Sequence, residues 1–260
     1  SRGAAGYLPQ PACRDNAGHW FFCRFPLIRL FAIRPMSLPA PSHLILAAPQ
    51  NPQQLFLLFH GVGDSAQGLA PLGEFIAAHF PQAAVVSLDS PHFCDFAAGY
   101  QWYSVQGATD DDRHALVAEQ MPRFIAMVQH WQQHFGVAPE ATCLLGFSQG
   151  AFMSLQSTQQ AVFLAGRVVA LAGRFTQVPA LPVHPVVIHL LHGDQDAVVP
   201  HHHSVAAAER LQALGGDATL NIIEGLGHGI DNDMAQAIIT RLTSYVPKRI
   251  WAEAMRSAGD

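Results

Sequence analysis

The sequence predicts an α/β fold built on a mostly parallel sheet, and two observations lead to this prediction. From residue 44 onward, short apolar runs alternate with longer segments of helical periodicity, which is typical of βαβ units. Several segments, such as "LFLLF" and "TCLLGF", form continuous, largely apolar runs, as in strands that are buried on both faces. Helices should therefore cover both faces of the sheet.

The individual elements follow from these runs and periods. We expect strands at 44–48, 55–60, 83–88, 142–147, 167–171, 186–192 and 218–224. Helical patterns fill 68–79, about 112–135, 149–160, 203–214 and 232–245. Pro122 should kink or restart the second of these helices, because proline lacks an N–H group and its ring clashes with the preceding turn.

The composition is that of a well-filled globular protein, with 50% apolar and 13% charged residues in a chain of 260. The formal net charge is −5, and lysine and arginine do not cluster in the main body of the chain. Nucleic acid and anionic membrane surfaces are therefore not expected as partners, and small molecules are. No apolar run is long enough to span a bilayer, so no stable membrane insertion is expected.

Residues 1–35 differ from the rest in charge. They hold five arginines and one acid, Asp15, which makes them about +4 where residues 36–260 are about −9. Arginines interrupt the apolar stretch "WFFCRFPLIRLFAIRP", whereas the core of a secretory signal peptide is uninterrupted. A signal peptide and a mitochondrial-type amphipathic leader are therefore the less favoured alternatives for this segment. We interpret residues 1–35 as an upstream extension or disordered leader before Met36, and residues 36–260 as a single domain.

The four cysteines, Cys13, Cys23, Cys94 and Cys143, are widely spaced and form no C-x-x-C pair. This pattern predicts reduced thiols in a cytoplasmic protein and no structural zinc.

The segment "TCLLGFSQGAFMSL", residues 142–155, contains the pattern G-x-S-x-G around Ser148. Composition alone would produce this pattern in roughly one chain in twelve, so its context has to be considered. An apolar strand, a sharp turn and a helix follow one another here, as in a nucleophile elbow with a strained serine at its tip. Gly146 and Gly150 would let strand and helix pass closely. An ordinary capping serine in a glycine-rich turn is the alternative.

A nucleophilic serine needs a histidine base and a carboxylate that orients it, and around such an elbow they follow in the order Ser, Asp/Glu, His. His201, His202 and His203 come too soon after the segment "HGDQD" to return on a separate loop. His228, in "EGLGHGID", lies on the loop after the last strand, at the carboxyl edge of the sheet where reactive groups collect. Asp194 and Asp196 both fit the carboxylate, and spacing does not choose between them.

The oxyanion of a tetrahedral intermediate needs two backbone N–H donors. One should come from Gln149, the residue after the candidate nucleophile. The loop "HGVGD" after the strand 55–60 offers the second, which we expect at Val62 because the flanking Gly61 and Gly63 let N–H groups point inward.

Five segments together resemble a known family: "FHGVGDSAQG", "QWYSVQG", "GFSQGAFMSL", "HGDQDAVVP" and "GLGHGID". Their order and spacing are similar to those of the phospholipase/carboxylesterase (acyl-protein thioesterase-like) family of α/β-hydrolases, over about residues 53–246 and most of all to its small bacterial cytosolic esterases. The resemblance implies an α/β-hydrolase fold, with helices on both faces of the sheet.

The resemblance also implies site residues. It assigns the catalytic triad to Ser148, Asp196 and His228 and the first-loop oxyanion donor to Val62, and it places the pair Trp102 and Tyr103 beside the acyl site. Two positions depart from the family pattern: Gly229 stands where relatives often have serine, and Tyr103 where phenylalanine is common. These departures concern substrate selectivity.

We therefore expect a serine hydrolase that cleaves carboxylic esters or thioesters of short to medium acyl chain through an acyl-enzyme, with no metal or organic cofactor. Only 14 residues separate the strands 167–171 and 186–192, too few for a helical lid, so the site should be open. Trp102, Tyr103 and Phe152 are candidates for its apolar walls, although each could equally be core packing.

Three other functions compete with this hypothesis. A metal site could use His192, Asp194, Asp196 and the run His201–His203. A catalytically silent small-ligand binding protein and a peptidase of the same fold are the other two.

The tail "IWAEAMRSAGD" places Ile250, Trp251, Ala254 and Met255 on one helical face. We expect this face to dock on the domain or, in a possible homodimer, on a second subunit.

Overall fold

The computed structural model describes residues 13–14, 20–21, 42–181 and 185–257. The chain divides into two units, Ser1–Ser37 and Leu38–Asp260, and each is described by itself. In the first unit, β1 (Cys13–Arg14) pairs antiparallel with β2 (Trp20–Phe21). The rest of the expected extension, with Met36, lies outside the described residues, and the domain division stays a prediction.

Seven strands of the second unit form one sheet in the order β11-β10-β9-β8-β4-β5-β3. All neighbours are parallel except β3, which runs antiparallel to β5 at one edge. The predicted α/β fold with a mostly parallel sheet is confirmed, and each predicted strand lies within one residue of its observed position. The strands are β3 (His43–Ala47), β4 (Gln54–Phe59), β5 (Ala83–Leu88), β8 (Thr142–Phe147), β9 (Arg167–Leu171), β10 (Val187–Gly193) and β11 (Asp217–Ile223).

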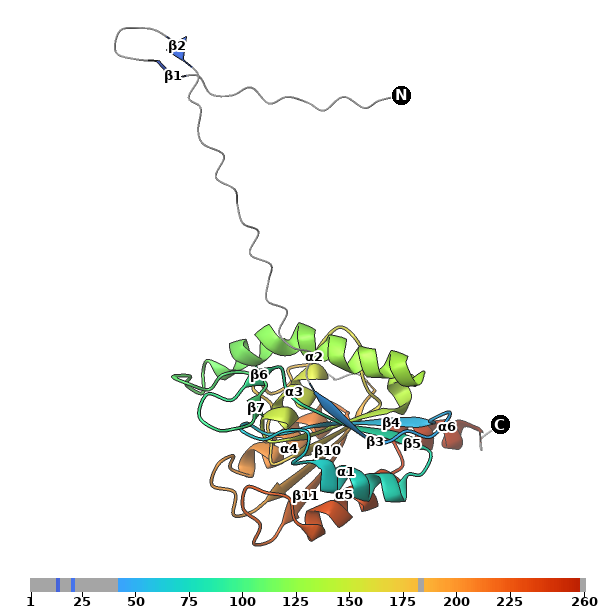
Figure 1. Cartoon of the computed structure of the whole chain (residues 1–260). Coiled ribbons are helices and arrows are strands. Elements are labelled where there is room, and N and C mark those ends of the chain that lie inside the picture. The colour runs from blue at the N-terminus through green and yellow to red at the C-terminus, as the bar shows by residue number, and fades with distance from the viewer. Residues whose placement is uncertain (1–12, 15–19, 22–41, 182–184, 258–260) are drawn as a thin grey trace, which may run out of the picture. The chain divides into compact units, whose positions relative to one another are not determined.

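Helices cover both faces of the sheet, as the continuously apolar strands predict (Figure 1). Within β4, Leu57 and Phe59 join one core and Phe56 and Leu58 the other, because successive side chains of a strand point to opposite faces. The first core contains residues of α2 (Arg113–Phe135), α3 (Gln149–Ser157) and α4 (His202–Ala213). The second contains residues of α1 (Ala70–His79) and α5 (Asn232–Ser244).

Pro122 does not restart α2, which runs from Arg113 to Phe135 without a break, so that part of the expectation is wrong. Pro122 itself is exposed, while Met121 and Phe124 beside it are buried in the first core. The apolar face of the helix therefore holds it together across the one N–H group that proline lacks.

Two features of the fold have little signal in the sequence. The strands β6 (His92–Phe93) and β7 (Tyr100–Gln101) form a small antiparallel hairpin, and a 3-10 turn spans Pro139–Ala141. Strands of two residues show no measurable alternation, so periodicity cannot find them.

The tail is helical, as α6 (Lys248–Ser257). The expectation that its apolar face docks on the domain is wrong, because the side chains of that face are exposed. The exposed fractions are 41% for Ile250, 60% for Trp251 and 71% for Met255. Of the helices in the described ranges, none combines the length and the apolar character that crossing a membrane would require.

Candidate active site

Ser148 stands between the end of β8 and the start of α3, with backbone angles φ 51° and ψ −116°. A non-glycine residue with positive φ is strained and needs the surrounding structure to hold it. The Ser148 N–H group donates to the carbonyl of Leu171 at 2.9 Å, which ties the turn to the neighbouring strand β9.

The two glycines of the pattern are required by close backbone contacts. A Cβ atom at Gly150 would lie 2.1 Å from the carbonyl oxygen of Phe59, and one at Gly146 would lie 2.4 Å from the carbonyl of Gly150. This confirms the predicted close passage of helix and strand, which a side chain at either glycine would prevent.

His228 reaches Ser148 from the loop between β11 and α5. Its Nε2 atom lies 3.0 Å from Ser148 Oγ, and its Nδ1 atom lies 2.7 Å from Asp196 Oδ2. An imidazole with its proton on Nδ1 therefore donates to the carboxylate and can accept the serine proton on Nε2. The fold thus brings together three side chains from three separate strand ends.

Asp196 is buried and receives three hydrogen bonds from outside β10. Its Oδ1 atom accepts from the N–H groups of Val198 and Val199, each at 2.8 Å, and its Oδ2 atom accepts from His228. Burial opposes ionisation, but these hydrogen bonds outweigh it and lower the pKa of Asp196. Asp194 instead accepts from the N–H of Gly225 at 2.7 Å. The geometry thus separates the two aspartates that spacing left equal.

A second imidazole, that of His192, supports Asp196 from the interior. Its Nε2 atom lies 2.7 Å from the carbonyl of Val199 and 3.1 Å from Asp196 Oδ2, and its Nδ1 atom lies 2.7 Å from Ser204 Oγ. Burial lowers the pKa of His192, so the ring is neutral and donates through Nε2. The sequence alone did not connect His192 with Asp196, although their separation of four residues could have indicated this contact.

The side chains expected for a metal alternative are not arranged as a ligand set. In the part of the chain that the structure describes, no three His, Cys, Asp or Glu side chains are grouped so that they could hold a metal ion. His201 precedes α4, and His203 instead lines the cavity beside Ser148.

Val62 and Gln149 line the same cavity as Ser148. No described residue accepts a hydrogen bond from either backbone N–H group. The side chain of Gln149 has a further role that the sequence did not reveal: Oε1 accepts from the N–H of Trp102 at 2.7 Å, and Nε2 donates to the carbonyl of Tyr103 at 2.8 Å. It thereby ties the segment after β7 to the turn that carries Ser148.

The cavity beside Ser148 has a volume of about 370 Å³. Its walls are partly apolar and partly charged. The apolar lining comes from Val62, Val105, Phe152, Val198, Val199 and Pro200, and the charged or titratable lining from Asp110, Arg113, Arg174 and His203.

The three aromatic residues expected near the acyl chain take three different positions. Phe152 lines the cavity of Ser148, whereas Tyr103 lines a second cavity and Trp102 lines neither of the two. Trp102 is 1% exposed, packs edge-on against Phe59, and donates from Nε1 to the carbonyl of His60 at 2.9 Å. Since its ring is enclosed by the core, only Phe152 of the three reaches the cavity beside Ser148.

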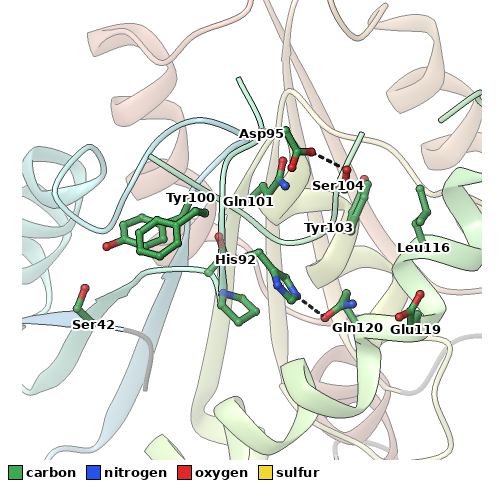
Figure 2. A pocket seen from close by; sticks show the side chains of 13 residues that line it. Ser42, His92, Asp95, Tyr100, Gln101, Tyr103, Ser104, Leu116, Glu119 and Gln120 are labelled. Atoms are coloured by element: carbon green, nitrogen blue, oxygen red, sulfur yellow. Dashed lines mark hydrogen bonds between the residues drawn. The ribbon is translucent and has the colours of Figure 1, made fainter. Parts of the chain in front are cut away.

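The second cavity, shown in Figure 2, is larger, at about 550 Å³, and lies between the β6–β7 hairpin and α2. His92 contacts Gln120 across it, with 3.0 Å between Nε2 and Oε1, and Ser104 donates to Asp95 at 2.5 Å (Figure 2). Its lining includes the carboxylates of Asp95 and Glu119 and no arginine or lysine of the described residues. Ser148 is not part of it.

Comparison with known proteins places this chain in a family. The family model for Phospholipase/Carboxylesterase matches residues 41–246. The chain is 45% identical to "Esterase YpfH" of Escherichia coli (strain K12) over 215 residues, which are 82% of this chain and 93% of that protein. It is 27% identical to "Acyl-protein thioesterase 1" of Kluyveromyces lactis over 184 residues, covering 63% of this chain and 78% of that protein.

Solved structures agree with this placement. The crystal structure of esterase PE8 superimposes with a TM-score of 0.71 and 28% identity, covering 80% of this chain and 99% of that chain. The α/β-hydrolase fold that the sequence motifs implied, without a large lid domain, is thereby confirmed. The chain belongs to the phospholipase/carboxylesterase family and is a hydrolase of the carboxylesterase and thioesterase type.

Proposed function

We propose that the chain hydrolyses carboxylic esters or thioesters with Ser148 as nucleophile, His228 as general base and acid, and Asp196 as the group that orients the base. One observation carries the proposal: Ser148 Oγ lies 3.0 Å from His228 Nε2 at a strained turn that opens on a cavity. Nucleophile and base within hydrogen-bond distance, with the base oriented by a third group, are what an activated serine needs.

The reaction follows from this arrangement. His228 Nε2 takes the Ser148 proton while the serine oxygen attacks the carbonyl carbon, and the N–H groups of Val62 and Gln149 donate to the oxyanion. The protonated Nε2 then gives its proton to the leaving alcohol or thiol as the acyl-enzyme forms. Water is deprotonated at Nε2 and attacks the acyl carbon in turn, which releases the acid and restores the serine. Asp196 stays ionised throughout and stabilises the imidazolium.

The cavity supports acyl chains of short to medium length. Its volume of about 370 Å³ is at the low end of the usual range for small-molecule sites, and Phe152 and Val105 give it an apolar wall. Hydrolysis rates across a series of para-nitrophenyl acyl esters, compared with an acyl thioester, determine the preferred length and the preferred bond.

A fluorophosphonate probe tests the nucleophile. We expect covalent labelling of the folded protein, and loss of labelling and of ester hydrolysis in Ser148→Ala. Absence of labelling in the folded wild type would contradict the proposal and favour a catalytically silent ligand-binding protein. Cleavage of peptides at a higher rate than esters would instead favour a peptidase.

The same proposal includes the compartment, the binding partners and the oligomeric state of the chain. Cys94 and Cys143 are free thiols, which fits a reducing compartment such as the cytoplasm. The net charge of −5 makes a nucleic-acid partner unfavourable. A homodimer would cover the exposed Trp251 of α6, and sedimentation of the wild type and of Trp251→Glu tests it.

A further inference from the structure

The cavity beside Ser148 contains two arginines that the reaction does not use. Arg113 begins α2, and Arg174 lies on the loop after β9. Their guanidinium carbons lie 5.5 Å and 5.7 Å from the centre of the Phe152 ring, which lines the same cavity as Ser148. The start of α2 and the loop after β9 are distant in sequence, and each places a cationic group near the same aromatic ring.

One carboxylate faces these two cations. Asp110 Oδ1 accepts from Arg113 Nε at 3.2 Å and also from Arg174 Nη2. Its side chain is 64% exposed, whereas those of Arg113 and Arg174 are only 29% and 15% exposed. The cations have thus lost more of their hydration than the single anion that pairs with them.

The other titratable group of the cavity does not balance this charge. Desolvation and, next, the charge of Arg174 lower the pKa of His203, so its ring is neutral near neutral pH. The lining of the cavity therefore carries two positive charges and one negative charge close to the nucleophile. The bonds to Asp110 use Nε of one guanidinium and Nη2 of the other, and each group has five N–H donors, so donors remain for a ligand.

We propose that Arg113 and Arg174 bind an anionic group, a carboxylate, of the ester or thioester substrate. This inference rests on the proposed function and names its substrate class. Arginine suits the task because its planar fork donates two parallel hydrogen bonds to a carboxylate and stacks on an aromatic face such as that of Phe152. The carboxylate belongs to the acyl chain or to the leaving alcohol, and substrates of both kinds separate the two.

The experiment compares kcat/KM for matched anionic and neutral esters. The first pair is the para-nitrophenyl monoester of glutaric acid against para-nitrophenyl pentanoate, with the charge on the acyl chain. The second is para-acetoxybenzoate against its methyl ester, with the charge on the alcohol. We expect the wild type to prefer the anionic member of one pair, and added salt to weaken that preference.

Substitutions identify the groups responsible. Arg174→Met and Arg113→Met each lower the ratio of anionic to neutral kcat/KM by about 10- to 100-fold, the range for a hydrogen bond to a charged group. Asp110→Asn raises the same ratio, because it removes the competing carboxylate. Arg123→Met removes an exposed cation from the same helix, outside the lining of the cavity, and keeps the wild-type ratio.

Two failures can be told apart. If the arginine variants change anionic and neutral esters in equal proportion, or if the wild type shows no anionic preference in either pair, the arginines only hold α2 to the loop after β9 and the inference is wrong. If the wild type hydrolyses none of the esters and takes no fluorophosphonate label, the proposed function itself fails.

Discussion

The cavity beside Ser148 and the larger cavity of Figure 2 share two segments of wall but differ in chemistry. The segment from Tyr100 to Val105 and the first turns of α2 contribute to both. The larger, of about 550 Å³, has carboxylates in its wall, while the smaller, of about 370 Å³, has Ser148 and two arginines. We base the proposed active site on position rather than on size. The smaller cavity contains Ser148, which follows β8, and Val198 and Val199, which follow β10, at the carboxyl ends of these strands.

Removal of the proposed nucleophile gives the largest expected difference between the cavities. Ser148→Ala should lower kcat by about a million-fold, as in serine hydrolases whose nucleophile acts with its base as a unit. The matched control is Ser104→Ala, which removes a hydroxyl from the wall of the larger cavity and should leave kcat near its wild-type value. Comparable losses in both variants would end the distinction between the cavities.

The two neighbouring aspartates provide the next test. Asp196→Asn should lower kcat by about ten-thousand-fold, because the amide no longer stabilises the imidazolium or holds the tautomer of His228. Asp194→Asn, whose side chain bonds only to the N–H of Gly225 among the described contacts, is the control and should retain most of the activity. Steady-state kinetics on one para-nitrophenyl ester measures both, and a reversal of the two effects would assign the carboxylate to Asp194.

Two buried histidines of β10, the strand that precedes Asp196, should make the free energy of unfolding depend on pH. Burial lowers the pKa of His189 in β10 to about 3, and it also lowers the pKa of His192. Below about pH 6.5 the unfolded chain binds protons that the folded chain does not, so stability is present above this pH and lost as pH falls. Between the pKa of the unfolded chain and its own lowered pKa, His189 contributes a slope of about 1.4 kcal/mol per pH unit.

His189→Gln removes one of these two groups. We expect denaturant unfolding between about pH 6.5 and about pH 4 to show a smaller slope of the free energy of unfolding against pH. The slope should correspond to the uptake of one proton fewer on unfolding than in the wild type. An unchanged slope would mean that His189 is protonated in the folded protein or that the unfolded chain does not bind the extra proton.

A charge change in the larger cavity should have the smallest effect. Glu119→Gln should alter kcat/KM for neutral and anionic esters by less than about twofold, the usual limit for an exposed side chain away from a site. An effect as large as that of Arg174→Met would show that the substrate reaches into the larger cavity, so that both cavities would contribute to substrate binding.

The sequence by itself determined the fold, and it indicated the order of the proposed catalytic groups. Short apolar runs predicted seven strands to within one residue. The pattern is clearest in inner strands such as β4, β5 and β8, because a strand buried on both faces is apolar almost throughout, whereas the edge strands β3 and β11 are only partly buried. The elbow around Ser148 was visible as one contiguous pattern, and Gly146 is required by a contact with Gly150 four residues later. Gly150 is required by a contact with Phe59 of the adjacent strand β4. His228 followed from its place after the last strand.

Only the tertiary structure decided which side chains face the cavity. Asp194 and Asp196 share one turn, and the distance of 2.7 Å to His228 Nδ1 distinguishes them. Trp102 is enclosed by the core, although its motif predicted an acyl wall. Arg113 and Arg174 are far apart in the chain and show no joint pattern in it. Periodicity reports which face of an element is buried, whereas convergence of side chains depends on how separate elements pack, and that packing is not local.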